Sequence, residues 1–224
     1  MENLILVAAS GLARETAVAL RGSTRYRVRG YLDDDVALAG TSVDDLPVLG
    51  PIDAAASYGD CSFVVCVGKG VVRAAIVRRL AGLGVGPDRY GTVIAASVVV
   101  PGGCTVGVGS ILLTGTVLTA AVTLGRHVVA MPHVVFTHDD EVGDYATFAA
   151  GVTLGGGVVV GPEAYVGMNA GVRERTRVGA GAVIGMGAVV LDDVPNGQTW
   201  AGVPARPIGV EKAVPAATNR GVTA

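Results

Sequence analysis

The chain has 224 residues, 50% of them hydrophobic, which is enough to bury a core and excludes disorder for most of its length. Its 17 basic and 19 acidic residues give a net charge of −2, and the absence of any Lys/Arg run excludes a nucleic-acid or anionic-membrane surface. Three cysteines without metal-ligand or redox spacing indicate reduced thiols and a cytoplasmic location.

The first 90 residues alternate apolar and helical stretches. Strands are predicted at residues 4–9, 28–35 and 63–67, and helices at residues 14–21 and after Gly68-Lys69-Gly70. The run at residues 4–9 is short, follows an acidic residue and ends in a Ser-Gly turn, so it predicts a buried strand and not a signal peptide. This order predicts a Rossmann-like α/β domain with a small parallel sheet over residues 1–90.

The turn at residues 8–13 is a weakened glycine-rich dinucleotide loop that lacks two of its three glycines. The start of its helix could still hold a phosphate or a carboxylate, and the next strand should end at the same crevice. Lys69 and Arg73 could bind an anionic part of a ligand, or could be exposed cations at the start of a helix. The candidate ligand-binding residues of this domain are Ser10, Gly11, Asp33, Asp34, Gly68 and Lys69.

A six-residue repeat organises the next hundred residues. Every sixth residue from Ile94 to Val190 is apolar, 17 positions in all, and the residue two places earlier is small or β-branched apart from Asp140. A period of six suits short strands joined by tight turns around a triangular prism, with three hexads in each coil. The pattern therefore predicts a left-handed parallel β-helix of five to six coils. Glycine often follows the apolar position, and we expect these glycines to serve turns of unusual φ.

The chain ends in a turn at residues 192–197, the segment Ala201-Gly202-Val203-Pro204-Ala205-Arg206-Pro207, and a tail rich in Ala, Thr, Val and Pro. We therefore assign the β-helix and its C-terminal segment to residues 91–209. Residues 210–224 are predicted to form a flexible tail.

Three motifs together point to a known family: the hexapeptide array, the stretch Thr137-His138-Asp139 followed by Val142-Gly143-Asp144, and the segment at residues 201–207. Over essentially its whole length the chain resembles the sugar acyltransferases of the sialic acid O-acetyltransferase and bacillosamine/perosamine N-acetyltransferase family. The resemblance implies a homotrimer, acetyl-CoA bound along the β-helix between neighbouring subunits, and an N-terminal domain that holds the acceptor sugar. No metal cofactor is expected.

His138 matches the catalytic base of this family and Asp139 the acidic residue that orients it. A histidine of near-neutral pKa suits the removal of a proton from an attacking amine or hydroxyl. Gly156 lies 18 residues beyond His138, on the same corner one coil further, where its amide could hold the thioester oxygen. The resemblance implies CoA contacts from Gly156, Met168 and Met186, and from Gly202, Val203, Pro204, Ala205 and Arg206.

Three positions depart from the family pattern. Leu12 and Thr147 stand where many members have histidine, and Met131 where many have asparagine. The donor chemistry is therefore better supported than the acceptor, for which an amino sugar or a nucleotide-linked amino sugar is expected.

Two alternatives stay open, and a third is disfavoured by its ligand count. The enzyme could be an O-acetyltransferase acting on the hydroxyl of a sugar or a natural product, or the chain could be a non-catalytic hexapeptide scaffold. His133 and His138 also have the spacing of two ligands in β-helical carbonic anhydrases, but Ser97 stands where the third ligand should lie and His127 belongs to another corner.

Overall fold

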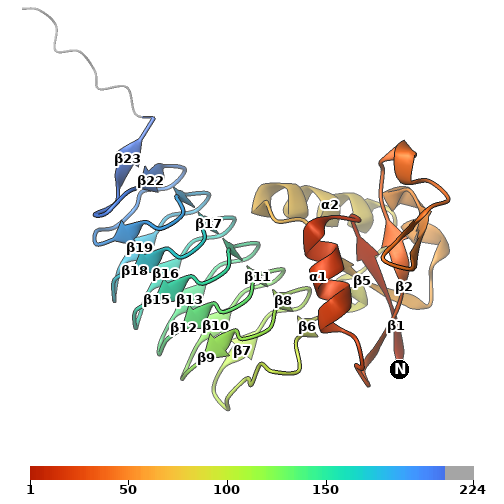
Figure 1. Cartoon of the computed structure of the whole chain (residues 1–224), viewed down its shortest axis with the longest axis horizontal. Helices are drawn as coiled ribbons and strands as arrows, with labels where there is room; N and C mark the ends of the chain where they lie inside the picture. Colours follow the sequence, from red (N-terminus) through yellow and green to blue (C-terminus); the bar gives the residue numbers. More distant parts are fainter. Residues whose placement is uncertain (210–224) are drawn as a thin grey trace, which may run out of the picture.

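The computed structural model describes residues 1–209, so the predicted tail lies outside the described residues. It consists of an N-terminal α/β part and a β-helix that extends away from it (Figure 1). Within residues 1–209, no helix has the length and the apolar content needed to cross a membrane.

A five-stranded sheet forms the centre of the N-terminal part, in the order β3-β4-β2-β1-β5. Its strands are β1 (Glu2–Val7), β2 (Tyr26–Leu32), β3 (Ser42–Val43), β4 (Leu46–Gly50) and β5 (Cys61–Val65). Only β3 is antiparallel to its neighbour, as expected for a Rossmann-like sheet. The sequence pattern did not reveal β3 and β4, because they are short, flank an Asp-Asp turn and include Pro47.

Helices cover both faces of this sheet. They are α1 (Gly11–Ala19), α2 (Gly70–Gly82) and three short 3₁₀ helices, η1 (Val36–Leu38), η2 (Ile52–Ser57) and η3 (Pro87–Arg89). On one face, Leu4 and Leu12 pack with Ile111 and Val129 of the β-helix, so the two parts of the chain share a core. On the other face, Leu80 of α2 packs within a second core.

The β-helix consists of strands of two or three residues stacked in three sheets, which are parallel apart from the last strand. The first sheet contains β6 (Val93–Ile94), β8 (Ile111–Leu112), β11 (Val129–Ala130), β14 (Thr147–Phe148), β17 (Tyr165–Val166), β20 (Val183–Ile184), β22 (Thr199–Ala201) and the antiparallel β23 (Arg206–Ile208). The second contains β9 (Val117–Leu118), β12 (Val135–Phe136), β15 (Thr153–Leu154), β18 (Gly171–Val172) and β21 (Val189–Val190). The third contains β7 (Thr105–Val106), β10 (Thr123–Leu124), β13 (Glu141–Val142), β16 (Val159–Val160) and β19 (Arg177–Val178).

We call these the first, second and third faces of the prism. Partners in adjacent coils are 18 residues apart, as in the pair Glu141 and Val159, which confirms three hexads in each coil. From Leu112 onward, every apolar position of the repeat is buried, whereas Ile94, Val100 and Val106 of the opening coil are partly exposed. The predicted β-helix is therefore confirmed.

The role expected for the glycines after the apolar positions was wrong. The left-handed φ values occur two residues later in each hexad, often without glycine, as at His127 (54°) and Asp139 (63°). Gly107 and Gly143 are needed for another reason: a Cβ atom at either would lie closer than 3.0 Å to backbone of the next coil. Close stacking of the coils, and not turn conformation, selects glycine there.

Candidate active site

His138 and Asp139 form an exposed pair at the corner between the second and third faces. They belong to the turn that joins β12 to β13, and the Asp139 amide donates to the carbonyl of Ala120 in the preceding coil. His138 Nδ1 lies 2.8 Å from Asp139 Oδ2, and both side chains are 67% exposed. Because a carboxylate only accepts, this bond requires the proton on Nδ1, which leaves the Nε2 lone pair free to take a proton.

Gly156 lies beside the imidazole on the next coil. The amide of Gly157 donates to the carbonyl of His138 at 2.8 Å, which joins the two coils. A Cβ atom on Gly156 would lie closer than 3.0 Å to Cε1 and Nε2 of His138, so any side chain would displace the ring. Among residues 1–209 the Gly156 amide donates no hydrogen bond. A proton acceptor and a free N–H donor therefore lie side by side, which suits acyl transfer.

Asp140 follows this pair and points into the prism. Its side chain is fully buried and accepts hydrogen bonds from the amides of Thr137 (2.8 Å) and Val158 (2.9 Å). Burial raises the pKa of the Asp140 carboxyl to about 6. Asp140 has no predicted role, although its charge at an otherwise small or β-branched inward position was a usable signal in the sequence.

Met168 and Met186 lie on another corner, between the first and second faces. They are one coil apart, joined by the bond from the Gly187 amide to the Met168 carbonyl (2.7 Å), and are 49% and 79% exposed. The second face separates them from His138 within one chain. A ligand that touches both methionines and His138 must therefore cross that face.

The segment at residues 202–205 joins β22 to β23 at the end of the β-helix. Gly202, Val203, Pro204 and Arg206 are exposed. Ala205 is 1% exposed, packs in the β-helix core and donates from its amide to the carbonyl of Val189. The side chain of Ala205 is therefore part of the core and not of a ligand surface.

The N-terminal candidates at the glycine turn are engaged in local hydrogen bonds. Ser10 caps α1 by accepting from the Ala13 amide (3.2 Å), and it donates to the carbonyl of Cys66 (2.6 Å). Asp33 accepts from the amide of Ala9 (2.7 Å), so the end of β2 does reach this turn. Gly11 begins α1 and is exposed, with open space beside it.

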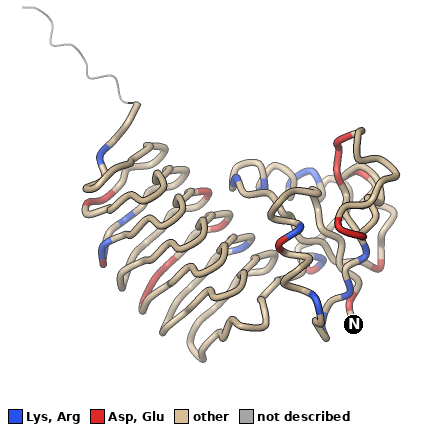
Figure 2. Tube along the Cα trace, in the orientation of Figure 1, with Lys and Arg blue, Asp and Glu red and all other residues tan. Residues whose placement is uncertain are grey.

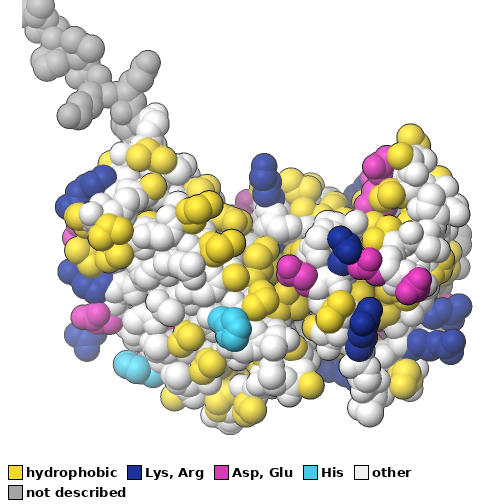
Figure 3. All heavy atoms as spheres, in the orientation of Figure 1, with side chains coloured by type: hydrophobic (Ala, Val, Ile, Leu, Met, Phe, Trp, Pro, Cys, Tyr) yellow, Lys and Arg dark blue, Asp and Glu magenta, His cyan; other side chains and the backbone are white. Residues whose placement is uncertain are grey.

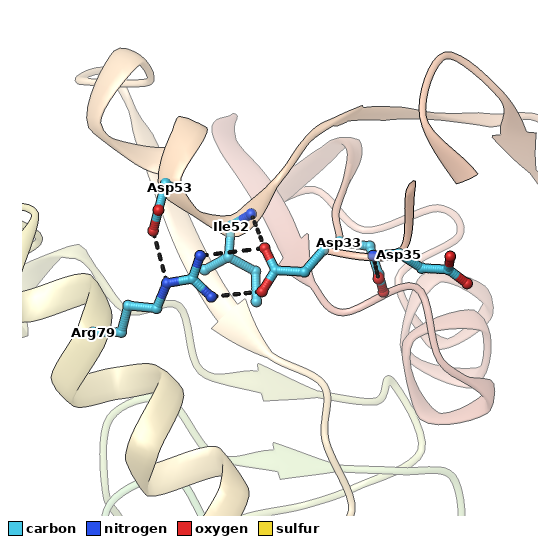
Figure 4. Close-up of polar contacts among 6 residues, drawn as sticks. Asp33, Asp35, Ile52, Asp53 and Arg79 are labelled. Atoms are coloured by element: carbon cyan, nitrogen blue, oxygen red, sulfur yellow. Dashed lines mark hydrogen bonds and ion pairs between the residues drawn. The ribbon is translucent and has the colours of Figure 1, made fainter. Parts of the chain in front are cut away.

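Asp34 points to Arg79 of α2 instead of the glycine turn. Figure 4 shows this arrangement, in which the guanidinium joins Asp53 to the carboxylate beside Ile52. The hydrogen bond from Arg79 lowers the pKa of the Asp34 carboxyl. Asp34 therefore forms an ion pair with Arg79, whereas the neighbouring Asp33 accepts hydrogen bonds from backbone amides.

Gly68 and Lys69 line a pocket of about 730 Å³ between α2 and the first face of the β-helix. Its walls are mainly apolar, and its charged side chains are Lys69 and Glu163. The apolar lining residues are Val67, Val71, Val72, Met131, Tyr165 and Val183. Figure 3 shows hydrophobic side chains gathered at the seam between the two parts of the chain, and Figure 2 shows few charged residues along the coils.

Arg73 is not available to a ligand, contrary to the role considered for it. Its side chain is fully buried between α2 and the β-helix. The guanidinium donates to the carbonyls of Val67, Gly68, His127, Tyr145 and Ala146 and to the hydroxyl of Thr147. Burial lowers the pKa of Arg73 to about 10. Helix periodicity alone could not show that another part of the chain covers this side of α2.

The three departures from the family pattern have distinct settings. Leu12 packs in the core shared by both parts of the chain. Thr147 is buried, and its hydroxyl donates to the carbonyl of Gly68 (2.7 Å). Met131 lines the pocket of Gly68 and Lys69.

The remaining histidines lie on corners other than that of His138. His127 is buried, stacked on Tyr145 (5.1 Å between ring centroids) and edge-on to Tyr90 (4.7 Å). His133 is exposed, at the corner of Met168. Within residues 1–209 no group of three or more His, Cys, Asp or Glu side chains is placed to hold a metal ion.

Comparisons with known proteins agree on both parts of the chain. Residues 3–80 match the family described as the PglD N-terminal domain. WeeI from Acinetobacter baumannii is 29% identical, with a TM-score of 0.82 over 93% of this chain and 100% of that one. The acetyltransferase domain of PglB from Neisseria gonorrhoeae with acetyl coenzyme A is 28% identical, with a TM-score of 0.81 over 92% and 99%.

A variant of perosamine N-acetyltransferase from Caulobacter crescentus, in complex with CoA and GDP-perosamine, is 25% identical, with a TM-score of 0.84 over 93% of this chain and 98% of that one. A comparison with curated protein sequences gives no match. The structural similarities cover nearly the full length of each protein, and so extend the N-terminal match through the β-helix. Residues 3–80 therefore match the PglD N-terminal domain family, and over nearly its whole length the chain is similar in sequence and fold to sugar acetyltransferases such as the perosamine N-acetyltransferase.

Proposed function

We propose that the protein transfers an acetyl group from acetyl-CoA to the amino group of an amino sugar or a nucleotide-linked amino sugar. The observation that carries the proposal is the exposed His138–Asp139 pair beside the free amide of Gly156. Acetyl coenzyme A in the PglB domain, and CoA with GDP-perosamine in the Caulobacter enzyme, support the choice of donor and acceptor.

The chemistry is a direct transfer. The acceptor amine attacks the thioester carbonyl while Nε2 of His138 takes its proton, and Asp139 stabilises the resulting imidazolium. The amide of Gly156 donates to the oxyanion that forms on the carbonyl carbon. When the tetrahedral intermediate collapses, the C–S bond breaks and the CoA thiolate receives the proton from His138.

A covalent acyl-enzyme is not needed for this chemistry. Cys66 is fully buried, and burial raises the pKa of its thiol to about 12, so it carries no thiolate at neutral pH. Cys61 is also buried, and desolvation raises the pKa of its thiol.

The pocket of Gly68 and Lys69 is the best candidate for the acceptor. It contains two of the N-terminal residues expected to bind substrate, and its size of about 730 Å³ suits a small molecule. Asp33, Ser10 and Gly11 are proposed to extend the acceptor site along the carboxyl ends of the parallel strands.

A homotrimer explains why the two halves of the site lie apart within one chain. The pocket opens at the first face, whereas His138 lies at the corner between the second and third faces. The second face presents one column formed by Val117, Val135, Thr153, Gly171 and Val189, a flat surface that is apolar except for Thr153 and suited to association. In this arrangement a neighbouring copy supplies the acceptor pocket, and acetyl-CoA lies between subunits along Met168, Met186 and Gly202 to Arg206.

The test is release of free thiol from acetyl-CoA by the wild type and by His138→Ala, with amino sugars, nucleotide-linked amino sugars and sialic acids as acceptors. Turnover that falls at least about 100-fold in the variant supports the proposal. Turnover only with acceptors that offer a hydroxyl group would identify the enzyme as an O-acetyltransferase. No turnover of any acceptor, together with no binding of CoA, would favour a non-catalytic scaffold.

A further inference from the structure

Asp140 occupies an unusual place in the β-helix. It lies at an inward position whose counterparts one coil before and after are Val122 and Val158, both fully buried. A carboxylate in such an interior is costly unless its oxygens accept hydrogen bonds. Both oxygens do so, one from Thr137 and one from Val158.

These two hydrogen bonds join the two halves of the catalytic corner. Thr137 immediately precedes His138, and Val158 follows Gly156 by two residues in the next coil. The Asp140 carboxylate therefore ties the turn that carries the imidazole to the coil that carries the free amide. Ser110 shows the same device elsewhere, since its hydroxyl accepts from the amide of Val128 in the next coil (2.9 Å).

We propose that Asp140 is a positioning residue for acetyl transfer, which holds the imidazole of His138 at its working distance from the amide of Gly156. The inference rests on the proposed function of His138. An error in position of about 1 Å can lower an enzymatic rate about 100-fold, so a residue outside the reacting groups can control kcat.

Protonation of Asp140 should weaken its hydrogen bonds with the amides of Thr137 and Val158. A carboxylate accepts from both amides, whereas a neutral carboxyl keeps one carbonyl oxygen and a hydroxyl that must itself donate. The other titratable groups whose charges act on Asp140 are His138 and Asp139. With a pKa of about 6 for Asp140, acid below that pH should act on the position of His138 through its effect on these two hydrogen bonds.

The test compares the wild type with Asp140→Asn, which has the same shape but cannot accept from both amides. We expect kcat to fall about 10-fold to 100-fold, the KM for acetyl-CoA to stay within about twofold, and the acid limb of the kcat profile to lose one ionisation. Ser110→Ala is the matched control, because it removes an inward polar group away from His138, and its kcat should equal that of the wild type.

Hydrogen exchange of the Thr137 and Val158 amides gives a second readout that does not need activity. Exchange should be slow in the wild type and at least about 10-fold faster in Asp140→Asn. If the Asn variant does not fold, Asp140→Ser, which keeps one acceptor as Ser110 does, should show an intermediate kcat and intermediate exchange. Absence of wild-type turnover would refute the proposed function, whereas unchanged kcat, pH profile or exchange in the variant would overturn the positioning role.

Discussion

Arg73 Nη2 in α2 donates a hydrogen bond of 2.9 Å to Oγ1 of Thr147 in β14, across the seam between the N-terminal part and the β-helix. The same threonine donates to the carbonyl of Gly68, which Arg73 also contacts. A buried cation thus joins the pocket of Gly68 and Lys69 to the coils, and within residues 1–209 it is surrounded by carbonyl oxygens from both parts of the chain instead of a carboxylate.

Arg73→Met should destabilise the protein by about 3 kcal/mol or more, because several buried carbonyls lose their donor. Urea unfolding monitored by circular dichroism measures this loss. Arg78→Met is the control, since Arg78 is an exposed cation on the same helix and its replacement should change the free energy of unfolding by less than about 0.5 kcal/mol. Equal stabilities of the two variants would contradict the structural role of Arg73.

Gly156→Ala should lower kcat at least about 100-fold, because the new methyl group occupies the space of the His138 ring. Steady-state thiol release with acetyl-CoA is the measurement. Gly102→Ala serves as the control: its Cβ would meet nothing within 4 Å, so its rate should match that of the wild type. A fully active Gly156→Ala enzyme would show that the ring need not lie over this glycine.

Asp139→Asn should lower kcat by about 10-fold to 100-fold and leave the KM for acetyl-CoA unchanged, because the amide stabilises the imidazolium less than the carboxylate does. Asparagine tolerates the left-handed φ of 63° at this position, so the turn should persist. Glu141→Gln, two residues away and exposed, is the matched control and should keep full activity. If Asp139→Asn is as active as the Glu141→Gln control, Asp139 does not contribute to catalysis and only His138 does.

The pH dependence of the free energy of unfolding should reveal the effect of burying His127. Burial lowers the pKa of His127 to about 4, so between about pH 4 and 6.5 the unfolded chain binds a proton that the folded state excludes. Burial of His127 therefore lowers the free energy of unfolding as the pH falls, by on the order of 3 kcal/mol at most. Asp140, with a raised pKa of about 6, acts in the opposite direction, because the folded state holds a proton that the unfolded chain releases.

Consequently, His127→Asn should lose less stability than the wild type on acidification from pH 6.5 to 4.5, as measured by urea unfolding at each pH. Asparagine suits the left-handed φ of 54° at this corner. His133→Asn, at an exposed corner with φ of 62°, should keep the wild-type pH dependence. If both variants follow the wild type, His127 takes up its proton in the folded state.

Val117→Arg should dissociate the proposed trimer, because a charge in the flat apolar surface of the second face must lose its hydration on association. Sedimentation velocity would measure the change in molecular mass. Val36→Arg, at a valine 89% exposed in η1, should leave the mass unchanged. A trimer that survives Val117→Arg would place the interface elsewhere.

The architecture could be predicted from residue spacing because a β-helix is built from local repetition. Each coil contacts mainly its neighbours, so an apolar residue at every sixth position is enough to predict the fold from the sequence. His138 could be identified by the family resemblance, because the motif that carries it is contiguous with Asp139. By contrast, β3 and β4 have no such periodic signal and form only through pairing with β2 and with each other.

The sequence by itself determined the β-helix, the parallel order of β1, β2 and β5, and the pairing of His138 with Asp139, because each depends on residues close in the chain or on a repeated spacing. Only the tertiary structure decided that Arg73 is buried, that Asp34 is partnered by Arg79, and that Asp140 joins two coils. Those contacts depend on which side chains of distant segments exclude water from one another, and that packing leaves no local pattern in the sequence.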